Sequence, residues 1–238
     1  MDEMIDFFNK IPPEFRKPLD ARESKKYHEI FALLTMQHFY PHMSANLVLK
    51  DSPDLQDLES SLGIEVTRII SPYKAKISGE FVKYRLNKKT RKHLKKFCKI
   101  AKDNGGKVLL AGGGIIYPSV NECDELGLLE SIVIQKGRKI ASYRGNGFNK
   151  LGLFVIYDSP MIPVPPIKIK SIIDSALSGL GNRFDFIILC DSGTMIHYDL
   201  ENGGFIISPY PRNVRESICQ TAFCTTVEIN SKNLVISI

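Results

Sequence analysis

Two acidic residues, Asp54 and Glu65, are the first candidates for chemistry because each lies in or beside a short apolar run. The segment Leu62 to Ile70 alternates as a β-strand does, with Glu65 on the face opposite to its immediate neighbours. An earlier strand leaves Leu47 to Leu49 and reaches Asp54, and a polar turn joins the two. A hairpin would bring both carboxylates to one point. Two such oxygen donors suit Mg²⁺ or Mn²⁺, with waters and phosphate as the remaining ligands.

The pairs Pro53-Asp54 and Glu65-Val66-Thr67 resemble the active-site hairpin of the PD-(D/E)XK nucleases, the restriction-endonuclease-like superfamily. That pattern has Pro-Asp on one strand and Asp/Glu-X-Lys on the next. Here Thr67 stands where the lysine is expected, and members with a Glu-Val-Thr strand carry the lysine on a later helix. The resemblance covers roughly residues 20–200 in element order.

The resemblance also implies roles for the residues around the two acids. The metal would be bound by Asp54 and Glu65, with the Val66 carbonyl as a further ligand. Thr67 and Gln56 would lie beside the site as hydrogen-bonding groups. An ordinary solvated turn beside an acid-lined strand would contain the same residues, so this assignment depends on the elements that flank the hairpin.

Lys136 is the candidate for the missing lysine. A helix is predicted from about Asp124 to Tyr143, and its buried stripe consists of Leu129, Ile132, Val133, Ile140 and Tyr143. Lys136 falls inside that stripe and Lys139 one step to its side. A lysine within an apolar stripe either extends to the rim or directs its ammonium group at an acid. If the helix packs beside the hairpin, Lys136 would stabilise the charge that develops on a phosphate.

An acidic residue on the helix before the hairpin is a further feature that the resemblance implies. The helix is predicted from Asp20, as N-cap, to about Phe39. Glu23 is on its apolar face near the start, so it is the first choice for a residue that assists at the metal, and Glu29 is the reserve. Either glutamate could instead cap the helix or be solvated.

The most basic stretch of the chain lies between residues 83 and 99. Its apolar residues have helical spacing, which predicts a helix with one cationic face. Such lysines can contact the phosphates of nucleic acid without reading its sequence, although a solvated basic helix has the same composition. The candidate nucleic-acid-binding residues are Lys88, Lys89, Arg91, Lys92, Lys95 and Lys96.

Strand–helix–strand alternation predicts an α/β fold. The segments 151–157 and 184–190 are continuously apolar, as strands covered on both faces are, and a helix is predicted over 167–180 between them. With the hairpin they would form a restriction-endonuclease-like mixed central sheet flanked by helices. We expect residues 1–19 to form an N-terminal arm and 20–238 a single domain. In the tail, 223–229 and 234–238 are predicted as short β segments.

Composition excludes several other classes. None of the apolar runs is as long as a membrane span, and the first residues do not form a secretory signal, so a cytoplasmic protein is expected. The five scattered cysteines contain no Cys-X-X-Cys pair, which disfavours a zinc site. The glycines at 112–114 match no nucleotide-binding loop, and no Ser-His-Asp arrangement is evident. The net charge of +6 is compatible with a polyanionic partner.

The sequence therefore predicts a Mg²⁺- or Mn²⁺-dependent DNA endonuclease that hydrolyses phosphodiester bonds. Two alternatives stay open. The motif position that should carry lysine is Thr67, which also fits a degenerate nuclease fold that only binds nucleic acid or a partner protein. The chain could also be an interaction subunit or a homo-oligomer, with the amphipathic arm at Ile5 to Phe8 docking on another chain.

Overall fold

The computed structural model describes residues 19–86, 91–109, 114–116, 122–157, 164–181 and 183–232. The chain divides into two compact units: Met1–Ser24 with Ile70–Val120, and Lys25–Ile69 with Asn121–Ile238. We call them the inserted unit and the sheet unit. Their boundaries at Ile70 and Val120 fall inside the range 20–238 that is expected to form a single domain. The expected arm at 1–19 lies almost wholly outside the described residues.

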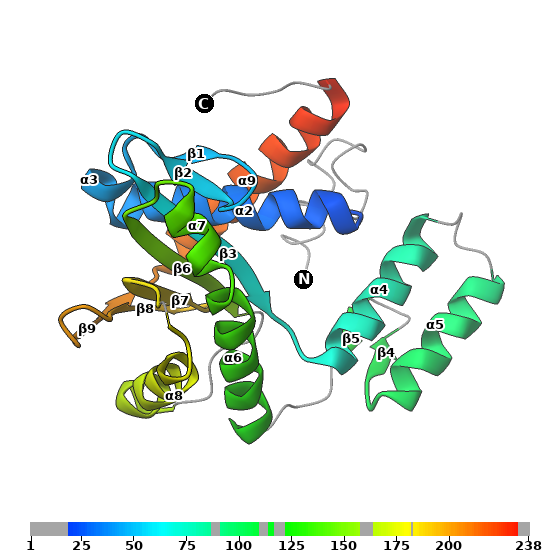
Figure 1. Cartoon of the computed structure of the whole chain (residues 1–238). Helices are drawn as coiled ribbons and strands as arrows, with labels where there is room; N and C mark the ends of the chain where they lie inside the picture. Colours follow the sequence, from blue (N-terminus) through cyan, green and yellow to red (C-terminus); the bar gives the residue numbers. More distant parts are fainter. Residues whose placement is uncertain are drawn as a thin grey trace. The chain divides into compact units, whose positions relative to one another are not determined.

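The sheet unit is built on seven strands in the order β1-β2-β3-β6-β7-β8-β9 (Figure 1). The two central pairings, β3 with β6 and β6 with β7, are parallel, and the remaining pairings are antiparallel. The hairpin and the two apolar strands thus share one mixed sheet, as predicted. The strands are β1 (Val48–Leu49), β2 (Leu55–Asp57), β3 (Leu62–Ile69), β6 (Lys150–Tyr157), β7 (Phe186–Cys190), β8 (Thr194–Asp199) and β9 (Phe205–Pro209).

Helices cover both faces of this sheet, which confirms the mixed α/β class. One apolar cluster joins α2 (Ala21–Phe39) and α9 (Arg212–Lys232) to one face of the strands. A second cluster joins α6 (Glu122–Gly137), α7 (Ile140–Gly145) and α8 (Pro166–Ser178) to the other face. The short α3 (Pro41–Ser44) leads from α2 into β1 (Figure 1). Successive side chains on β3 therefore face alternately towards α2 and α9 and towards α6, α7 and α8.

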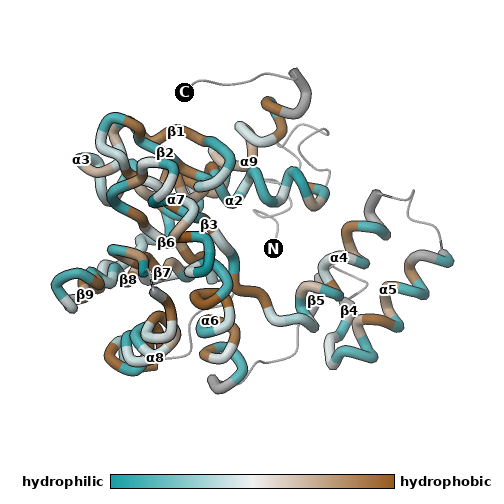
Figure 2. The backbone as a smooth tube through the Cα atoms, in the orientation of Figure 1, coloured by the Kyte–Doolittle hydropathy of each residue, from teal (hydrophilic) through white to brown (hydrophobic). Residues whose placement is uncertain are grey.

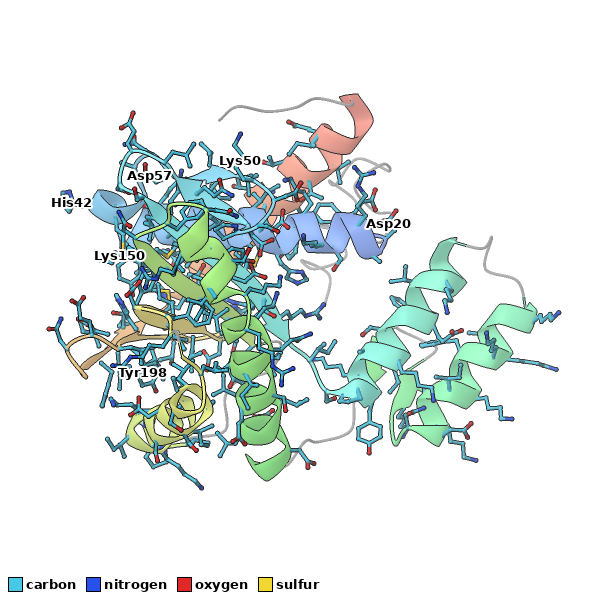
Figure 3. All side chains as sticks on the ribbon, viewed as in Figure 1. Asp20, His42, Lys50, Asp57, Lys150 and Tyr198 are labelled. Carbon is cyan, nitrogen blue, oxygen red and sulfur yellow. The ribbon has the colours of Figure 1, made fainter. Side chains whose placement is uncertain are left out.

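Burial on both faces explains the unbroken apolar sequence of β6. Every residue from Leu151 to Tyr157 is buried. Gly152 is the one small residue, and it pairs with Phe186 on β7. A Cβ atom at Gly152 would lie 2.2 Å from Cζ of Phe186, so the glycine leaves room for that ring. On the neighbouring strand, the hydroxyl of Tyr198 (labelled in Figure 3) donates to the Pro166 carbonyl at 3.0 Å and ties β8 to α8.

The inserted unit contains α4 (Pro72–Leu86), α5 (Arg91–Asp103) and a hairpin of β4 (Lys107–Leu109) and β5 (Gly114–Ile116). Its small core is formed by Ile77, Phe97 and Ala101. Figure 2 shows α5 alternating between teal and brown along its length, as an amphipathic helix does. The basic stretch 83–99 is therefore divided between two helices instead of forming the single helix expected.

Two other predicted elements differ from the structure. The helix expected from Asp124 to Tyr143 is two helices, because α6 ends at Gly137 and α7 begins at Ile140. The β segment expected at 223–229 is wrong: these residues belong to α9. Ile218, Ala222 and Thr226 are buried at a spacing of four residues, so packing of a helical face overrides the β-branched composition. The segment 234–238 lies outside the described residues.

Among the described residues, none of the helices combines the length and apolar character needed to cross a membrane.

His197 on β8 generates a prediction about pH and stability. Burial lowers the pKa of His197 below its ordinary value of 6.5, Lys150 lowers it further and Asp199 opposes the shift. The ring lies edge-on to Tyr40 and Phe186. The unfolded chain therefore binds a proton at a higher pH than the folded chain, and stability declines as the pH falls from about 6.5 through the folded pKa. In His197→Phe we expect this part of the decline to disappear.

Urea unfolding at a series of pH values between 7.5 and 5 measures the effect. His42→Asn is the control, since His42 is exposed at the outer end of α3 (Figure 3). A decline in His197→Phe as steep as in the unsubstituted protein would contradict the assignment.

Candidate functional site

The structure brings Asp54, directly before β2, beside the middle of β3, where Glu65 lies. β2 and β3 pair in antiparallel fashion from Leu55 with Ile64 to Asp57 with Leu62, and Asp54 is the residue directly before β2. The Val66 N–H group donates to Oδ2 of Asp54 at 2.8 Å. Both carboxylates are buried, with 5% of Asp54 and 2% of Glu65 exposed. The first predicted strand is shorter than expected, because residues 50–54 form a loop between β1 and β2.

Glu65 faces the helices α6 and α7 and receives three hydrogen bonds from these helices and the turn between them. Ile64 and Val66 pack in the cluster on the opposite face, so strand alternation directs Glu65 the other way. Its Oε1 atom accepts from Nζ of Lys136 at 2.6 Å and from Nζ of Lys139 at 2.8 Å. Its Oε2 atom accepts from the Tyr143 hydroxyl at 2.5 Å. A carboxylate removed from water is thus compensated by two positive charges and a hydroxyl.

These donors determine the ionisation of the site. Burial by itself would raise the pKa of Glu65, but the hydrogen bonds from Lys136, Lys139 and Tyr143 outweigh it and hold the pKa below the ordinary value. Burial, followed by the contact with Glu65, raises the pKa of Tyr143 far above its ordinary value. At neutral pH the glutamate is therefore an anion and the tyrosine a neutral donor.

The corner between α6 and α7 makes this arrangement possible. Lys136 lies in the last turn of α6, Lys139 follows in the turn, and Tyr143 is in α7. Lys136 is 19% exposed and Lys139 is 47% exposed, so the first is the more enclosed of the two ammonium groups. The sequence pattern singles out Lys136. It sets Lys139 beside the stripe without a role and presents Tyr143 only as an apolar residue.

On α2 the two glutamates occupy different environments. Glu23 forms a capping box with Asp20: its carboxylate accepts the Asp20 N–H at 2.7 Å, and Oδ1 of Asp20 accepts the Glu23 N–H at 2.9 Å. Glu29 is the acid on α2 that approaches Asp54. The Lys25 ammonium lies between them, 3.3 Å from Oε1 of Glu29 and 3.5 Å from Oδ1 of Asp54.

Glu29 is a buried acid with an unfavourable environment for its charge. Burial raises its pKa, and repulsion from Asp54 raises it further, while Lys26 and Lys25 act in the opposite direction. Only 4% of the residue is exposed. Glu29 and Asp54 therefore share the Lys25 ammonium group, while Glu65 is held separately by Lys136 and Lys139.

The remaining predicted residues take the following places. Thr67 is half-buried and, by alternation, on the same face of β3 as Glu65. The N–H and C=O groups of one strand residue point to the same side, so the Val66 carbonyl faces the side of Asp54. The Gln56 amide donates to the carbonyls of Pro53 at 3.0 Å and Asp51 at 3.4 Å, so it holds the loop that carries Asp54.

The donor chemistry fits a magnesium ion held largely by water. Enzymes commonly bind Mg²⁺ through one or two carboxylates, with waters and substrate phosphate as the other ligands. Asp54, Glu65 and the Val66 carbonyl supply this number of oxygen donors. Within the described ranges no three His, Cys, Asp or Glu side chains are grouped as a protein-only metal centre. Glu65 would have to exchange an ammonium contact for the cation.

The predicted basic surface lies on the inserted unit and is only partly described. Lys92, Lys95 and Lys96 are exposed on α5, but Lys96 is also 3.5 Å from Glu80 of α4. Arg91 begins α5, and its side chain is outside the described set. Lys88 and Lys89 lie outside the described residues. Lys99, seven residues after Lys92, is exposed and belongs to the same face.

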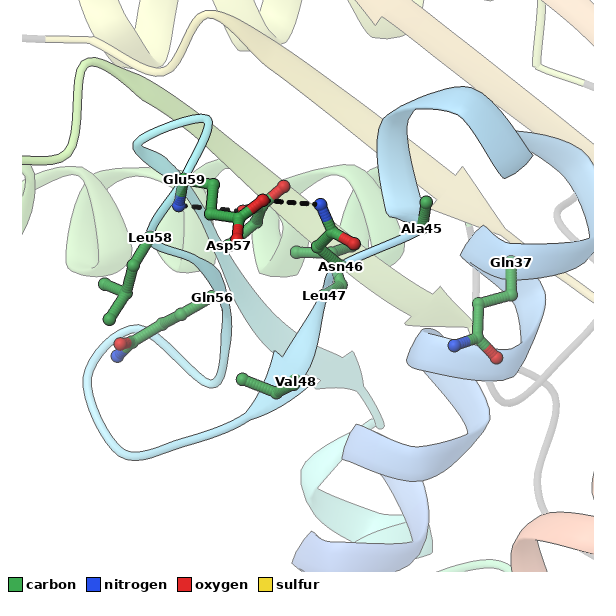
Figure 4. A pocket seen from close by; sticks show the side chains of 9 residues that line it. All are labelled: Gln37, Ala45, Asn46, Leu47, Val48, Gln56, Asp57, Leu58 and Glu59. Carbon is green, nitrogen blue, oxygen red and sulfur yellow. Dashed lines mark hydrogen bonds between the residues drawn. The ribbon is translucent and has the colours of Figure 1, made fainter. Parts of the chain in front are cut away.

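An open hollow lies near the same hairpin but holds none of the acid–lysine cluster. It is lined by residues of α2, β1, β2 and the turn after β2, among them Gln37, Asn46 and Glu59 (Figure 4). Asn46 donates to Oε2 of Glu59 at 3.2 Å, and Asp57 accepts the N–H groups of Glu59 and Ser60. The Asp57 contacts are internal to the turn, and the Asn46 contact joins the turn to the segment before β1. The chemistry concentrated at Glu65 makes that cluster, and not this hollow, the candidate site.

No family model, curated protein or solved structure matches this chain.

The two lysines of the site should contribute unequally to stability. Removing one partner of a buried ion pair costs about 3–5 kcal/mol because the other charge is left uncompensated. We expect Lys136→Met to lower the free energy of unfolding by roughly 3 kcal/mol, and Lys139→Met by about 1 kcal/mol or less because its head group is half exposed.

Urea denaturation at pH 7 distinguishes the variants. Lys170→Met is a matched control: Lys170 is also 19% exposed, but its partner Asp174 is 50% exposed, so the loss should stay below about 1 kcal/mol. Equal losses in the Lys136 and Lys170 variants would contradict the compensated buried charge.

Proposed function

We propose that the chain is a metal-dependent phosphodiesterase that cleaves DNA as an endonuclease. The observation that carries the proposal is the contact between Lys136 and Glu65, with 2.6 Å between Nζ and Oε1, close to Asp54 directly before the adjoining strand. Two acids and a lysine therefore lie together although Thr67 occupies the position that usually carries the lysine. The order α2, β1–β2–β3, α6, β6 also agrees with the resemblance to the PD-(D/E)XK superfamily.

In this proposal the residues of the chain divide the work. Asp54, Glu65 and the Val66 carbonyl would hold Mg²⁺ or Mn²⁺, and the bound ion would supply a water of lowered pKa and neutralise charge on the scissile phosphate. Lys136 positions the attacking water and stabilises the charge that develops on the phosphate oxygens. Tyr143 fixes the direction of the Glu65 carboxylate. Glu29, rather than Glu23, assists at the Asp54 side of the site.

Cleavage of supercoiled plasmid tests the proposal directly. The unsubstituted protein should nick the plasmid with Mg²⁺ or Mn²⁺ and not with EDTA. Asp54→Asn, Glu65→Gln and Lys136→Ala should each reduce the rate at least about 100-fold, because each removes a charge from the reacting centre. Branched and single-stranded DNA serve as further substrates.

Two control variants separate chemistry from folding. Asp57 is nearly as buried as Asp54, but its side chain accepts hydrogen bonds from Glu59 and Ser60 of its own turn. Lys170 is as exposed as Lys136 but pairs with Asp174 on α8. Asp57→Asn and Lys170→Ala should retain cleavage. Full activity in Lys136→Ala would exclude the role of that lysine, and equal activity with and without EDTA would exclude the metal-dependent reaction.

The exposed lysines of α5 generate a prediction about DNA affinity. Each phosphate contact contributes about −0.9 to the slope of log K against log[salt]. In the triple variant Lys92→Gln, Lys95→Gln, Lys99→Gln the slope should therefore become less steep by roughly 3. Fluorescence anisotropy on duplex DNA at salt concentrations from about 50 to about 300 mM measures the slope.

A variant with the same change in net charge controls for long-range attraction. This control is a triple variant of three exposed lysines of the sheet unit: Lys50→Gln, Lys150→Gln and Lys168→Gln. Equal slopes in the two triple variants would show that α5 makes no specific contribution.

A non-catalytic module that binds nucleic acid or a partner protein is the second candidate. It is favoured by the engagement of both Glu65 oxygens with Lys136, Lys139 and Tyr143. DNA binding that is unchanged by Mg²⁺ and by Asp54→Asn, together with no cleavage of any substrate, would select this candidate.

A further inference from the structure

The edge of the sheet at β9 is exposed and apolar. β9 is the last strand in the sheet order and, among the described strands, pairs only with β8 (Figure 1). Phe205, Ile206 and Ile207 are 39%, 65% and 51% exposed. With Ile167 of α8 they make up four of the six large hydrophobic residues that are exposed in the described parts of the chain. Such an edge is ready to accept another strand.

The hydrogen-bonding groups that point outward from β9 can be identified. The Asp199 N–H donates to the Gly204 carbonyl at 3.0 Å, and the Tyr210 N–H donates to the Gly193 carbonyl at 2.8 Å. The even-numbered residues of this segment therefore direct their main-chain groups at β8. Because the direction alternates along a strand, the N–H and C=O groups of Phe205 and Ile207 face outward.

Of the features with which proteins commonly protect an edge strand, the described part of β9 has only a proline at its end. No charged residue lies between Glu201 and Arg212. Pro209, which cannot donate a main-chain hydrogen bond, is at the end of the strand and leaves Phe205 and Ile207 unaffected. An uncharged strand with large apolar side chains on both faces, like those of Phe205 to Ile207 in β9, therefore suits this edge.

We propose that β9 pairs with β9 of a second copy of this chain, in antiparallel fashion about a two-fold axis. Directly opposite residues of an antiparallel pair have side chains on the same face of the sheet. The two-fold axis must therefore pass between a residue and the same residue of the other copy, and not between two successive residues. An axis at Ile206 sets Ile206 against its counterpart and Phe205 against Ile207. The outward N–H and C=O groups of Phe205 in each copy then form hydrogen bonds with the C=O and N–H groups of Ile207 in the other copy. An axis at Ile207 would instead oppose Phe205 to Pro209, which has no N–H to give.

The surface beside the strand extends this interface. Phe205 and Ile207 pair with Tyr198 and Ile196, which belong to the cluster covered by α8. The two-fold axis keeps the faces of the sheet, so α8 of each copy lies on the same side of the joined sheet, with the exposed Ile167 near its start. A stable interface buries about 800 Å² on each partner, which is more than one short strand provides, so α8 contributes to the contact.

Sedimentation velocity and light scattering on the full-length protein test the pairing. We expect a dimer whose dissociation constant rises at least about tenfold in Ile206→Lys, which sets two ammonium groups against each other at the axis. Ile207→Pro should have a similar effect, because it removes an outward N–H without removing a bond to β8. Leu58→Lys is the control, since Leu58 is 70% exposed in the turn after β2.

A cross-linking variant tests the register independently of stability. Residues at a non-hydrogen-bonded antiparallel position have Cα atoms about 4.5 Å apart, within the range of a disulfide. Ile206→Cys should form a covalent dimer on mild oxidation, whereas Leu58→Cys and the unsubstituted protein should not.

Several results of these experiments would overturn the proposed dimer or place its interface elsewhere. A single-copy mass at every concentration would overturn the proposal, as would an assembly that continues to grow beyond two copies. A dimer whose dissociation constant is unchanged by Ile206→Lys and Ile207→Pro would place the interface elsewhere. If either variant fails to fold by circular dichroism, the cross-linking variant decides the question, because the absence of a covalent dimer in Ile206→Cys would overturn the pairing.

Discussion

The candidate site depends on the burial of one negative charge. Glu65 is 2% exposed and lies on a strand packed between two apolar clusters. A carboxylate in such a position is tolerated only with close compensation. Its partners are 71, 74 and 78 residues away along the chain, so the corner between α6 and α7 must lie over β3 for the sheet to accept the charge. Stability and the geometry of the site are consequences of the same contacts.

The contacts of Glu65 therefore stabilise the fold whether or not the site is catalytic. An ion pair that neutralises a buried acid has a structural reason to exist without any reaction. The Asp54 side is different, because there Glu29 and Asp54 are close together with a mostly exposed lysine between them. Two buried acids that repel each other are unfavourable for folding, and such arrangements cluster at functional sites. Together with the Lys136–Glu65 contact, this second feature separates the cluster from an ordinary structural ion pair.

The sequence is most informative where a residue violates the pattern around it. Glu65 within an apolar strand and Lys136 within an apolar stripe each require a partner, and the structure places them together. Lys139 and Tyr143 give no such signal, because the helical pattern continues through Gly137 and does not reveal the corner. Glu29 comes second to Glu23 in the sequence because position along a helix stripe does not show which turn approaches a neighbouring strand. The tail is mispredicted for another reason: its β-branched residues mask the spacing of Ile218, Ala222 and Thr226, which becomes meaningful only against the sheet.

The inserted unit separates β3 from α6 in the chain, although β3 pairs with β6 along its whole length. Joining these two parallel strands therefore requires closure of a long loop before the central sheet can form. The entropy lost in such a closure grows with the logarithm of loop length, by about 0.6 kcal/mol for each doubling. If residues 70–120 are already compact, the effective loop is shorter and closure is less costly. In that case, substitutions in α4 or α5 that loosen the inserted unit would slow the pairing of β3 with β6, and with it the assembly of the acid–lysine cluster, without touching that cluster.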